Sequence, residues 1–275
     1  MSIAGNAQTP VETKLLENAR NFSVKDRVVI VTGSGQGIGR ELVRQFAAAG
    51  AIVVVADLSL PNAQSVEAEI EASGGKALAL PVDVSKKESV DAMVKAVLGK
   101  HGRIDVLINN ASLFSTLAKR PFDQIPAAEW QMVMNVNING VFFCAAAVAQ
   151  TMRDQGFGRI INISSASVHR GTKNYLHYVT SKSALIGMTN SLARELGPHG
   201  VTANCIRPGT VATEVAERVA SLTPEIRQRN IDLQCIPRTM VPSDLVGIAM
   251  FLSTDAAAFI TGQTIACDAG YTHSF

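Results

Sequence analysis

Tyr178 and Lys182 are the side chains whose types and spacing most directly suggest chemistry. They lie in "NYLHYVTSK", residues 174–182, and in a helix positions four residues apart share one face. An ammonium group beside a phenol favours the phenolate, so we expect the pKa of Tyr178 to fall below its usual value of about 10. Such a tyrosine exchanges protons near neutral pH. The pattern alone leaves a second interpretation open, a solvated surface lysine.

A glycine-rich turn, "TGSGQGIGR", follows the first apolar run of the chain. Its spacing is G-x-x-x-G-x-G, because Ile38 replaces the last glycine of the G-x-G-x-x-G fingerprint. Glycines let a backbone turn sharply and approach a pyrophosphate, and the following helix offers free N–H groups and positive potential. The position between a strand and an amphipathic helix favours a dinucleotide site over a simple turn. We assign to it Gly33, Ser34, Gln36, Gly37, Ile38 and Gly39.

Asp57 ends the second apolar run and predicts which dinucleotide binds. A carboxylate at this position binds both hydroxyls of an adenosine ribose and repels a 2′-phosphate. Gln36 in the turn and Leu58 after the strand supply no cation for such a phosphate, and Arg40 is the only one nearby. We therefore predict NAD rather than NADP. The alternative, an ordinary strand-end residue that begins a turn, stays open.

Composition narrows the class of protein. The 275 residues are 47% hydrophobic and 17% charged, with a net charge of +2, which fits one large α/β domain and gives no basic patch for nucleic acid or a membrane surface. The four cysteines include no C-x-x-C pair, which disfavours a disulfide framework or a cysteine-ligated metal site and favours a reducing compartment. Glu12 and Glu17 interrupt the first 20 residues, which lack the apolar segment of a secretory signal. We predict a cytoplasmic protein without a metal.

An uncharged stretch at 131–152 could be mistaken for a membrane span. It contains Asn135, Asn137 and Asn139, and side-chain amides are costly in lipid unless they are paired. We predict a helix inside the protein.

Short β-branched runs alternate with amphipathic segments of helical length over nearly the whole chain. Continuous apolar runs are typical of a parallel sheet covered on both faces, and the alternation predicts a single α/β domain with a Rossmann-like, doubly wound sheet. We expect an N-terminal arm at 1–25, with a short helix around 12–20, and a catalytic domain at 26–275. The predicted strands are 27–33, 51–57, 76–84, 104–111, 159–165, 201–209 and 263–270.

At this point the sequence resembles the short-chain dehydrogenase/reductase family over about residues 27–270. The resemblance rests on several motifs that occur in the family's order and at similar spacing. They are "TGSGQGIG" at 32–39, "DV" at 83–84, "NNAS" at 109–112, "NVNING" at 135–140, "INISS" at 161–165, "YVTSK" at 178–182 and "PGTVAT" at 208–213.

The resemblance implies a catalytic set. Tyr178 would be the acid/base group, and Lys182 would lower its pKa and hold the nicotinamide ribose. Ser165 would hydrogen-bond the substrate oxygen, and Asn137 would hold a water that links Lys182 to solvent.

The resemblance also implies further cofactor contacts. Asp83 and Val84 would flank the adenine, Asn110 the adjacent ribose, and Val211 and Thr213 the nicotinamide carboxamide.

Each assignment has a neighbour that competes with it. Spacing from Tyr178 favours Ser165 over Ser164, and the pattern N-x-x-G-V-F favours Asn137 over Asn135. His177 is adjacent to Tyr178, but a lone histidine is more often a packed or surface residue. His169, four residues after Ser165, is a candidate for lining the substrate pocket.

The sequence departs from the family pattern at Ser112 and in "CDAG" at 267–270, where the family usually has glycines. Three segments should form the substrate pocket: the loop after "NNAS", the segment after Ser165, and a helical lid at 214–240. His169, Arg170 and Lys173 would favour a polar substrate, whether polyhydroxylated or anionic, unless they are solvated surface charges.

These observations predict an NAD(H)-dependent oxidoreductase that interconverts a secondary alcohol (a polyol, sugar or small hydroxylated metabolite) and a ketone. The runner-up is an NADPH-dependent 3-oxoacyl-acyl-carrier-protein reductase, and a different class is an NAD-binding sensor or scaffold without chemistry. The resemblance implies a homotetramer with interfaces from the apolar helices at 127–154 and 175–197.

Overall fold

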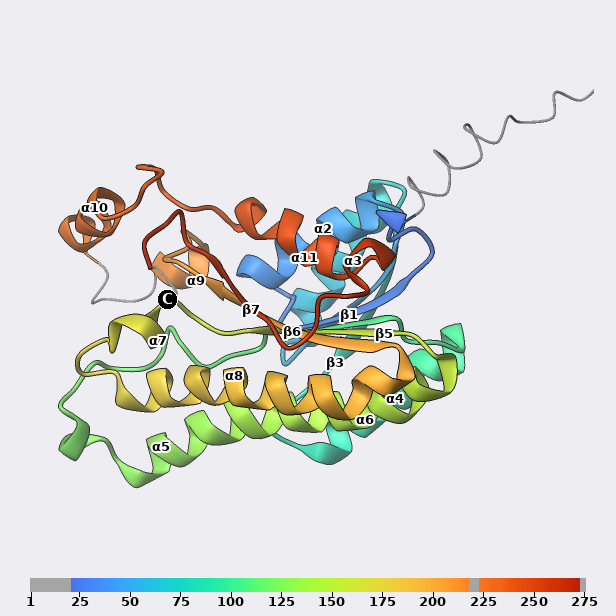
Figure 1. Cartoon of the computed structure of the whole chain (residues 1–275), viewed down its shortest axis with the longest axis horizontal. Coiled ribbons are helices and arrows are strands. Elements are labelled where there is room, and N and C mark those ends of the chain that lie inside the picture. Colours follow the sequence, from blue (N-terminus) through green and yellow to red (C-terminus); the bar gives the residue numbers. More distant parts are fainter. Residues whose placement is uncertain (1–20, 218–222, 273–275) are drawn as a thin grey trace, which may run out of the picture.

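A seven-stranded parallel sheet forms the centre of the molecule in the computed structural model, which describes residues 21–217 and 223–272 (Figure 1). The strand order is β3-β2-β1-β4-β5-β6-β7, which confirms the predicted doubly wound sheet. The strands are β1 Val28–Thr32, β2 Ile52–Asp57, β3 Lys76–Pro81, β4 Val106–Asn109, β5 Gly158–Ile163, β6 Val201–Pro208 and β7 Thr264–Cys267. The short helix expected around 12–20 lies outside the described residues.

Helices cover both faces of the sheet, as Figure 1 shows. One face carries α2 Gly37–Ala48, α3 Leu60–Ala72 and α11 Val246–Leu252, and the other carries α4 Lys87–His101, α6 Gly140–Gln155 and α8 Leu176–Leu196. The remaining helices, α5 Ala127–Met134, α7 Ser167–Arg170, α9 Glu214–Glu217 and α10 Pro224–Asp232, lie at or near the carboxyl end of the strands. Short 3-10 turns are Phe122–Gln124, Gly197–His199, Pro242–Leu245 and Asp255–Ala257.

Side chains alternate between two cores along each strand, as the period of an extended chain requires. In β1, Val29 and Val31 face the core under α2, α3 and α11, whereas Val28 and Ile30 face the core under α4, α6 and α8. Both cores are closed to solvent, so the strands are held in fixed positions and their carboxyl ends form a rigid edge.

The helix from Ala127 to Gln155 is continuous but changes its winding at one place. Residues Asn135–Asn139 form a π-helical segment between α5 and α6, a local widening that often marks functional sites. By length and composition this helix could cross a membrane, with a mean hydropathy of 1.6, but core helices of soluble proteins pass the same test. In the described structure 44% of its most apolar window is buried against the rest of the chain.

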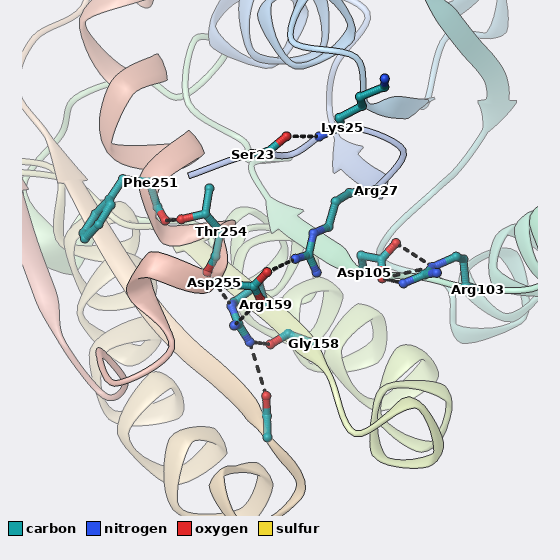
Figure 2. A network of polar contacts seen from close by, with 11 residues as sticks. Ser23, Lys25, Arg27, Arg103, Asp105, Gly158, Arg159, Phe251, Thr254 and Asp255 are labelled. Atoms are coloured by element: carbon teal, nitrogen blue, oxygen red, sulfur yellow. Dashed lines mark hydrogen bonds and ion pairs between the residues drawn. The ribbon is translucent and has the colours of Figure 1, made fainter. Parts of the chain in front are cut away.

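At the amino end of the strands, a buried arginine joins segments that are distant in sequence (Figure 2). Arg159 is 2% exposed, and its guanidinium donates to the carbonyl oxygens of Thr254, Gly158 and Gly200 at 3.2, 2.9 and 3.2 Å. Asp255 lies 3.7 Å from it and also accepts from Arg27 at 2.7 Å. Burial lowers the pKa of Arg159 to about 10, and Asp255 partly offsets this effect.

We predict that Arg159→Met lowers the free energy of unfolding by about 3 kcal/mol, because the carbonyl groups of Thr254 and Gly158, both buried, and that of Gly200 lose their donor. Urea denaturation measures the change. Arg194→Met, at an exposed position of α8, is the control and should stay within about 0.5 kcal/mol of the wild type. Equal effects of the two substitutions would mean that the buried network contributes nothing.

Candidate active site

Tyr178 and Lys182 lie on the buried face of α8, one helical turn apart. The ammonium group of Lys182 is 5.9 Å from the centroid of the Tyr178 ring and donates a hydrogen bond of 2.8 Å to the carbonyl oxygen of Ile163, the last residue of β5. Lys182 is 3% exposed, so the interpretation as a solvated surface lysine is wrong.

The pKa of Tyr178 differs from our prediction. Burial raises it to about 12, and a hydrogen bond with Ser165 lowers it in part, while Lys182 is not among its causes. The prediction that Lys182 lowers this pKa is therefore wrong for the chain by itself, because removal of the phenol from water outweighs an ammonium group at this distance. Burial also lowers the pKa of Lys182 to about 8.

The two serines after β5 have different partners. Ser164 is buried and donates its hydroxyl to the carbonyl oxygen of Lys182 at 2.8 Å. Ser165 hydrogen-bonds with Tyr178, and its Oγ accepts from the N–H of Ser167 at 3.2 Å. Ser165 is thus the hydroxyl beside the phenol, which agrees with the choice made from spacing.

Asn137 lies in the middle of the π-helical segment and is fully buried. Its Oδ1 accepts from the N–H of Leu113 at 2.7 Å, and its Nδ2 donates to Leu113 O and Ser181 Oγ at 3.2 and 3.0 Å. Ser181 in turn donates to the carbonyl oxygen of Tyr178. Asn137 therefore joins the loop after β4 to α8, whereas Asn135 bonds only neighbours on its own helix, Gln131 and Asn139.

The glycine turn begins where β1 ends, at the same edge as Tyr178. A Cβ atom at Gly39 would lie 2.3 Å from the carbonyl oxygen of Gly33, so only glycine permits this approach. Gly37 opens α2 with a φ of 58°, a left-handed conformation that glycine adopts without strain. Ser34 is buried and donates to Val31 O at 2.7 Å, and Ile38 packs partly buried against the core.

Asp57 faces the glycine turn from the end of β2. Its two carboxylate oxygens accept from the N–H groups of Gly35 at 2.8 Å and Ser59 at 2.9 Å, and it lines the same cleft as Gln36 and Gly37. Leu58 is exposed and lies outside this cleft lining.

The one cation that we considered for a 2′-phosphate is engaged elsewhere. Arg40 donates to Glu69 through two nitrogen atoms, at 3.2 and 2.7 Å. This contact raises the pKa of Arg40.

Thr32 is a functional residue that the sequence analysis missed. Its hydroxyl accepts from the N–H groups of Asn110 and Ala111, each at 3.1 Å, while Asn110 Nδ2 donates to the carbonyl oxygens of Thr32 and Gly33. The ends of β1 and β4 are thereby joined. A hydroxyl residue directly before the glycine turn was the available signal.

Asp83 and Val84 do not line the cleft. The Asp83 carboxylate accepts from the N–H and hydroxyl of Ser85 and lies 3.1 Å from the Lys86 ammonium group; these contacts, the Ser85 hydroxyl first, lower its pKa. Val84 packs where a side chain on Gly140 would otherwise lie. Their contact with an adenine stays a prediction.

Val211 and Thr213 both line the cleft, as expected. Val211 is buried and pairs with Met240 in an isolated parallel bridge. The hydroxyl of Thr213 accepts from the N–H of Ala216 at 2.9 Å and so starts α9.

Glu214 is a second residue that sequence reasoning missed. Its Oε1 accepts from the N–H of Gly37 at 2.8 Å, so a carboxylate from α9 caps the N-terminus of α2. Anions are stabilised at this end of a helix. No local pattern indicates the contact, because the two residues are 177 positions apart.

The predicted lid at 214–240 is helical in α9 and α10, and residues 218–222 within it lie outside the described ones.

His169 does not line the cleft, so the prediction that it lines the substrate pocket is wrong. Its ring contacts Arg207 Nη1 instead. His177 is buried with its Nε2 3.2 Å from Glu129. Arg170 and Lys119 do line the cleft.

These elements enclose a cleft of about 320 Å³ that extends from Asp57 and the glycine turn to Ser165, Tyr178 and Lys182. A Cβ atom at Gly33 would lie 2.8 Å from Ala111 Cα, so the backbone of the glycine turn packs directly against the residues that follow β4. With an acid at one end, helical N–H groups in the middle, and a phenol and an ammonium group at the other end, the cleft fits a nicotinamide dinucleotide.

The comparisons with known proteins agree with this geometry. A family profile described as enoyl-(acyl carrier protein) reductase matches residues 33–272. The D-xylose 1-dehydrogenase of Caulobacter vibrioides is 34% identical over 90% of this chain and 97% of its own length. The 3-oxoacyl-[acyl-carrier-protein] reductase of Synechocystis sp. is 40% identical over 89% and 96%.

Two solved structures share the fold and hold different forms of the cofactor. A 7α-hydroxysteroid dehydrogenase with NADH and 7-oxo glycochenodeoxycholic acid is 32% identical, with a TM-score of 0.87 over 92% of this chain and 97% of the other. A gluconate 5-dehydrogenase from Burkholderia cenocepacia with NADP and tartrate is 30% identical, with a TM-score of 0.87 over 94% and 100%. Because matches of this extent include both the sheet and the cleft, the chain belongs to the short-chain dehydrogenase/reductase family and is an oxidoreductase of alcohols or ketones.

Proposed function

We propose that the protein is an NAD(H)-dependent oxidoreductase that interconverts a secondary alcohol and a ketone, with a polyol, a sugar or a small hydroxylated metabolite as substrate. The observation that carries the proposal is the meeting of Ser165, Tyr178 and Lys182 at the end of β5. The Ser165 hydroxyl and the Tyr178 phenol are hydrogen-bonded to each other, and the Lys182 ammonium group lies 5.9 Å from the centroid of the phenol ring. Together they would provide a hydrogen bond to a substrate oxygen and a route for its proton.

In alcohol oxidation, Ser165 orients the substrate hydroxyl toward Tyr178, and the phenolate oxygen of Tyr178 accepts its proton. In ketone reduction the phenol returns that proton to the developing alkoxide. A nicotinamide cofactor held in this cleft would supply the hydride chemistry in both directions. Lys182 supplies positive charge beside Tyr178, and Asn137 holds the loop after β4 against α8.

The same proposal assigns the other half of the cleft to the cofactor. Asp57 would bind the adenosine ribose, the N-terminus of α2 would bind the pyrophosphate, and Val211 and Thr213 would hold the carboxamide. We assign Asn110 to the ribose adjacent to the adenine, since Asn110 lines the cleft and bonds the carbonyl oxygen of Gly33.

A cytoplasmic homotetramer is also part of the proposal. Phe142 on α6, Met132 on α5 and Leu176 on α8 are large apolar side chains that are exposed in the single chain. Packing against other copies would remove them from water.

The runner-up function is a 3-oxoacyl-acyl-carrier-protein reductase, favoured by the 40% identity with the Synechocystis enzyme. A dinucleotide-binding sensor without chemistry would have no need for Ser165, Tyr178 and Lys182 to line the same end of the cleft. Tight NADH binding with no turnover on a broad panel of alcohols would favour the sensor.

Tyr178→Phe should lower kcat for every alcohol that the wild type oxidises by about 100-fold or more, because no other side chain replaces the phenol as the acid/base group.

In the wild type, kcat/KM for oxidation should rise from about pH 6 to about pH 8. The pKa of the Tyr178 phenol is raised, so the fraction present as phenolate increases with pH over this range. Reduction, which needs the protonated phenol, should not rise.

Tyr175→Phe is the matched control for this experiment. Its hydroxyl donates to Phe114 O at 2.8 Å, so the substitution removes a loop contact but no step of proton transfer, and most of the activity should remain. Near-normal turnover by Tyr178→Phe would refute the proposed mechanism.

The cofactor assignment predicts that kcat/KM for NAD exceeds that for NADP by about 100-fold or more, because a 2′-phosphate would meet the Asp57 carboxylate. Asp57→Asn should narrow this ratio, while Asp91→Asn, an exposed acid paired with Lys87, should not change it. Steady-state kinetics with both cofactors decide the matter. A preference for NADPH would favour the runner-up function.

Glu214→Gln should strengthen NADH binding by about threefold to tenfold, because the Glu214 carboxylate and the cofactor pyrophosphate compete for the N–H of Gly37. Fluorescence titration gives the dissociation constants. Glu217→Gln, an exposed position at the other end of α9, is the control and should bind as the wild type does. Weaker binding by Glu214→Gln would mean that Glu214 supports the glycine turn instead.

A further inference from the structure

Arg170 is a cation that the proposed reaction does not use. It ends α7 and lines both the main cleft and a smaller adjoining hollow of about 30 Å³. Within the residues that the structure describes, no carboxylate lies within ion-pair distance of it. A guanidinium that faces a cleft without a counter-charge attracts anions.

Neighbouring side chains hold Arg170 in place. Its Nη1 donates to Asn230 Oδ1 at 3.2 Å and to the hydroxyl of Tyr271, and its guanidinium carbon is 4.8 Å from the centroid of the Tyr271 ring. Asn230 is itself buried and donates to Thr210 Oγ1. These contacts use one nitrogen of a group that has five N–H donors, so the guanidinium is positioned while Nε and Nη2 remain available for a carboxylate.

Two hydroxyl groups beside Arg170 point to a polar ligand. Ser167, three residues earlier and on the same side of α7, is 7% exposed, and its Oγ is buried without a hydrogen-bond partner. The Oγ1 of Thr172 is also buried without a partner, and both residues line the cleft. A buried hydroxyl without a partner costs free energy, and a ligand oxygen would remove that cost.

The two ends of the cleft carry charges of opposite sign. Asp57 is the only acidic residue among the described residues that line it, and it ends β2, which is three strands away from β5 in the sheet. At the spacing of hydrogen-bonded strands this is roughly 14 Å. The end near Ser165 instead has Lys119, Arg170 and Lys182, so its net charge is positive.

We propose that Arg170, with the hydroxyl groups of Ser167 and Thr172, forms a subsite for the carboxylate of the substrate, which makes the substrate class a small hydroxy acid. This inference rests on the proposed oxidoreductase function and makes its substrate class narrower. The reacting carbinol lies at Ser165 and Tyr178, and the acid group lies at Arg170, so the same α7 segment that follows Ser165 orients both ends of the molecule. Neutral polyols and sugars lack the group that Arg170 binds.

The test uses matched substrates, namely aldonic acids with four to six carbons and alditols of the same configuration, assayed with NAD and with NADP. We expect kcat/KM for the acids to exceed that for the alditols by about tenfold or more. Arg170→Gln should lower kcat/KM for the acids by about 30-fold, mainly through KM, and change that for the alditols by less than about threefold. Arg170→Lys keeps the positive charge but lacks the planar guanidinium that binds both oxygens of a carboxylate. Its kcat/KM for the acids should lie between that of the wild type and that of Arg170→Gln.

Two further variants test whether the preference for acids depends on the charge of Arg170 in the cleft. Lys173→Gln removes an exposed cation from the same segment outside the cleft lining, and it should leave the preference for acids unchanged. Tyr271→Phe removes one contact that positions Arg170 but keeps its charge, so it should weaken the preference for acids less than Arg170→Gln does. A second readout is competitive inhibition by succinate of whichever alcohol is oxidised best, which should be lost in Arg170→Gln.

Other results overturn the inference in distinguishable ways. An equal loss for acids and alditols in Arg170→Gln would mean that Arg170 only ties α7 to α10 and the C-terminal segment. Oxidation of neutral alcohols, or reduction of 3-oxoacyl thioesters, without any preference for acids would refute the subsite but leave an oxidoreductase. No turnover of any alcohol or ketone with either cofactor would refute the proposed function itself.

Discussion

The burial of the Lys182 ammonium group beside the Tyr178 phenol is the constraint on which the proposed site depends. A buried charge without a partner is costly, and here the carbonyl oxygen of Ile163 accepts from the ammonium group at 2.8 Å. The return contact, from the Ser164 hydroxyl to the carbonyl oxygen of Lys182, fixes the same two elements again. With β5 and α8 held in register by both bonds, Ser165 comes next to Tyr178.

The parallel sheet extends this arrangement to the rest of the cleft. Carboxyl ends of parallel strands meet at one edge, so the residues that follow β1, β2, β4, β5 and β6 line one cleft although they are far apart in sequence. Thr32 joins β1 to β4 through the N–H groups of Asn110 and Ala111, and Asn137 joins the loop after β4 to α8. The side chains of the proposed site are therefore supported from several elements at once.

The sequence predicted those parts of the arrangement that depend on the order and spacing of residues within a single strand or helix. Apolar runs predicted all seven strands, and the spacing of Tyr178 and Lys182 on one helix predicted that their side chains share a face. These two inferences need only the geometry of a strand or a helix. The role of Ser165, and its choice over Ser164, came instead from the motif spacing in the resemblance to the short-chain dehydrogenase/reductase family.

What the sequence did not reveal depends on contacts between distant segments. The rise in the pKa of Tyr178 follows from burial by other elements, which a helical pattern does not contain. The role of Glu214 at the N-terminus of α2 and the position of His169 beside Arg207 likewise depend on how loops pack after the sheet has formed. The π-helical segment Asn135–Asn139 was not predicted, and the bonds of Asn137 within it to Leu113 and Ser181 join segments that are distant in sequence.

Charge along the cleft links the two proposals. The acid at the end of β2 suits the hydroxyl groups of a ribose, and the cations near β5 suit an anionic substrate, so an anionic substrate would be attracted to the end near β5 and repelled from Asp57. Glu214 lies between them, on the N-terminus of α2, and belongs to the helix that begins the lid. A pyrophosphate bound at Gly37, as we propose, would compete with this carboxylate for the same N–H group. Because Val215 and Ala216 of the same helix line the cleft, displacement of α9 by that competition would also change the shape of the cleft wall.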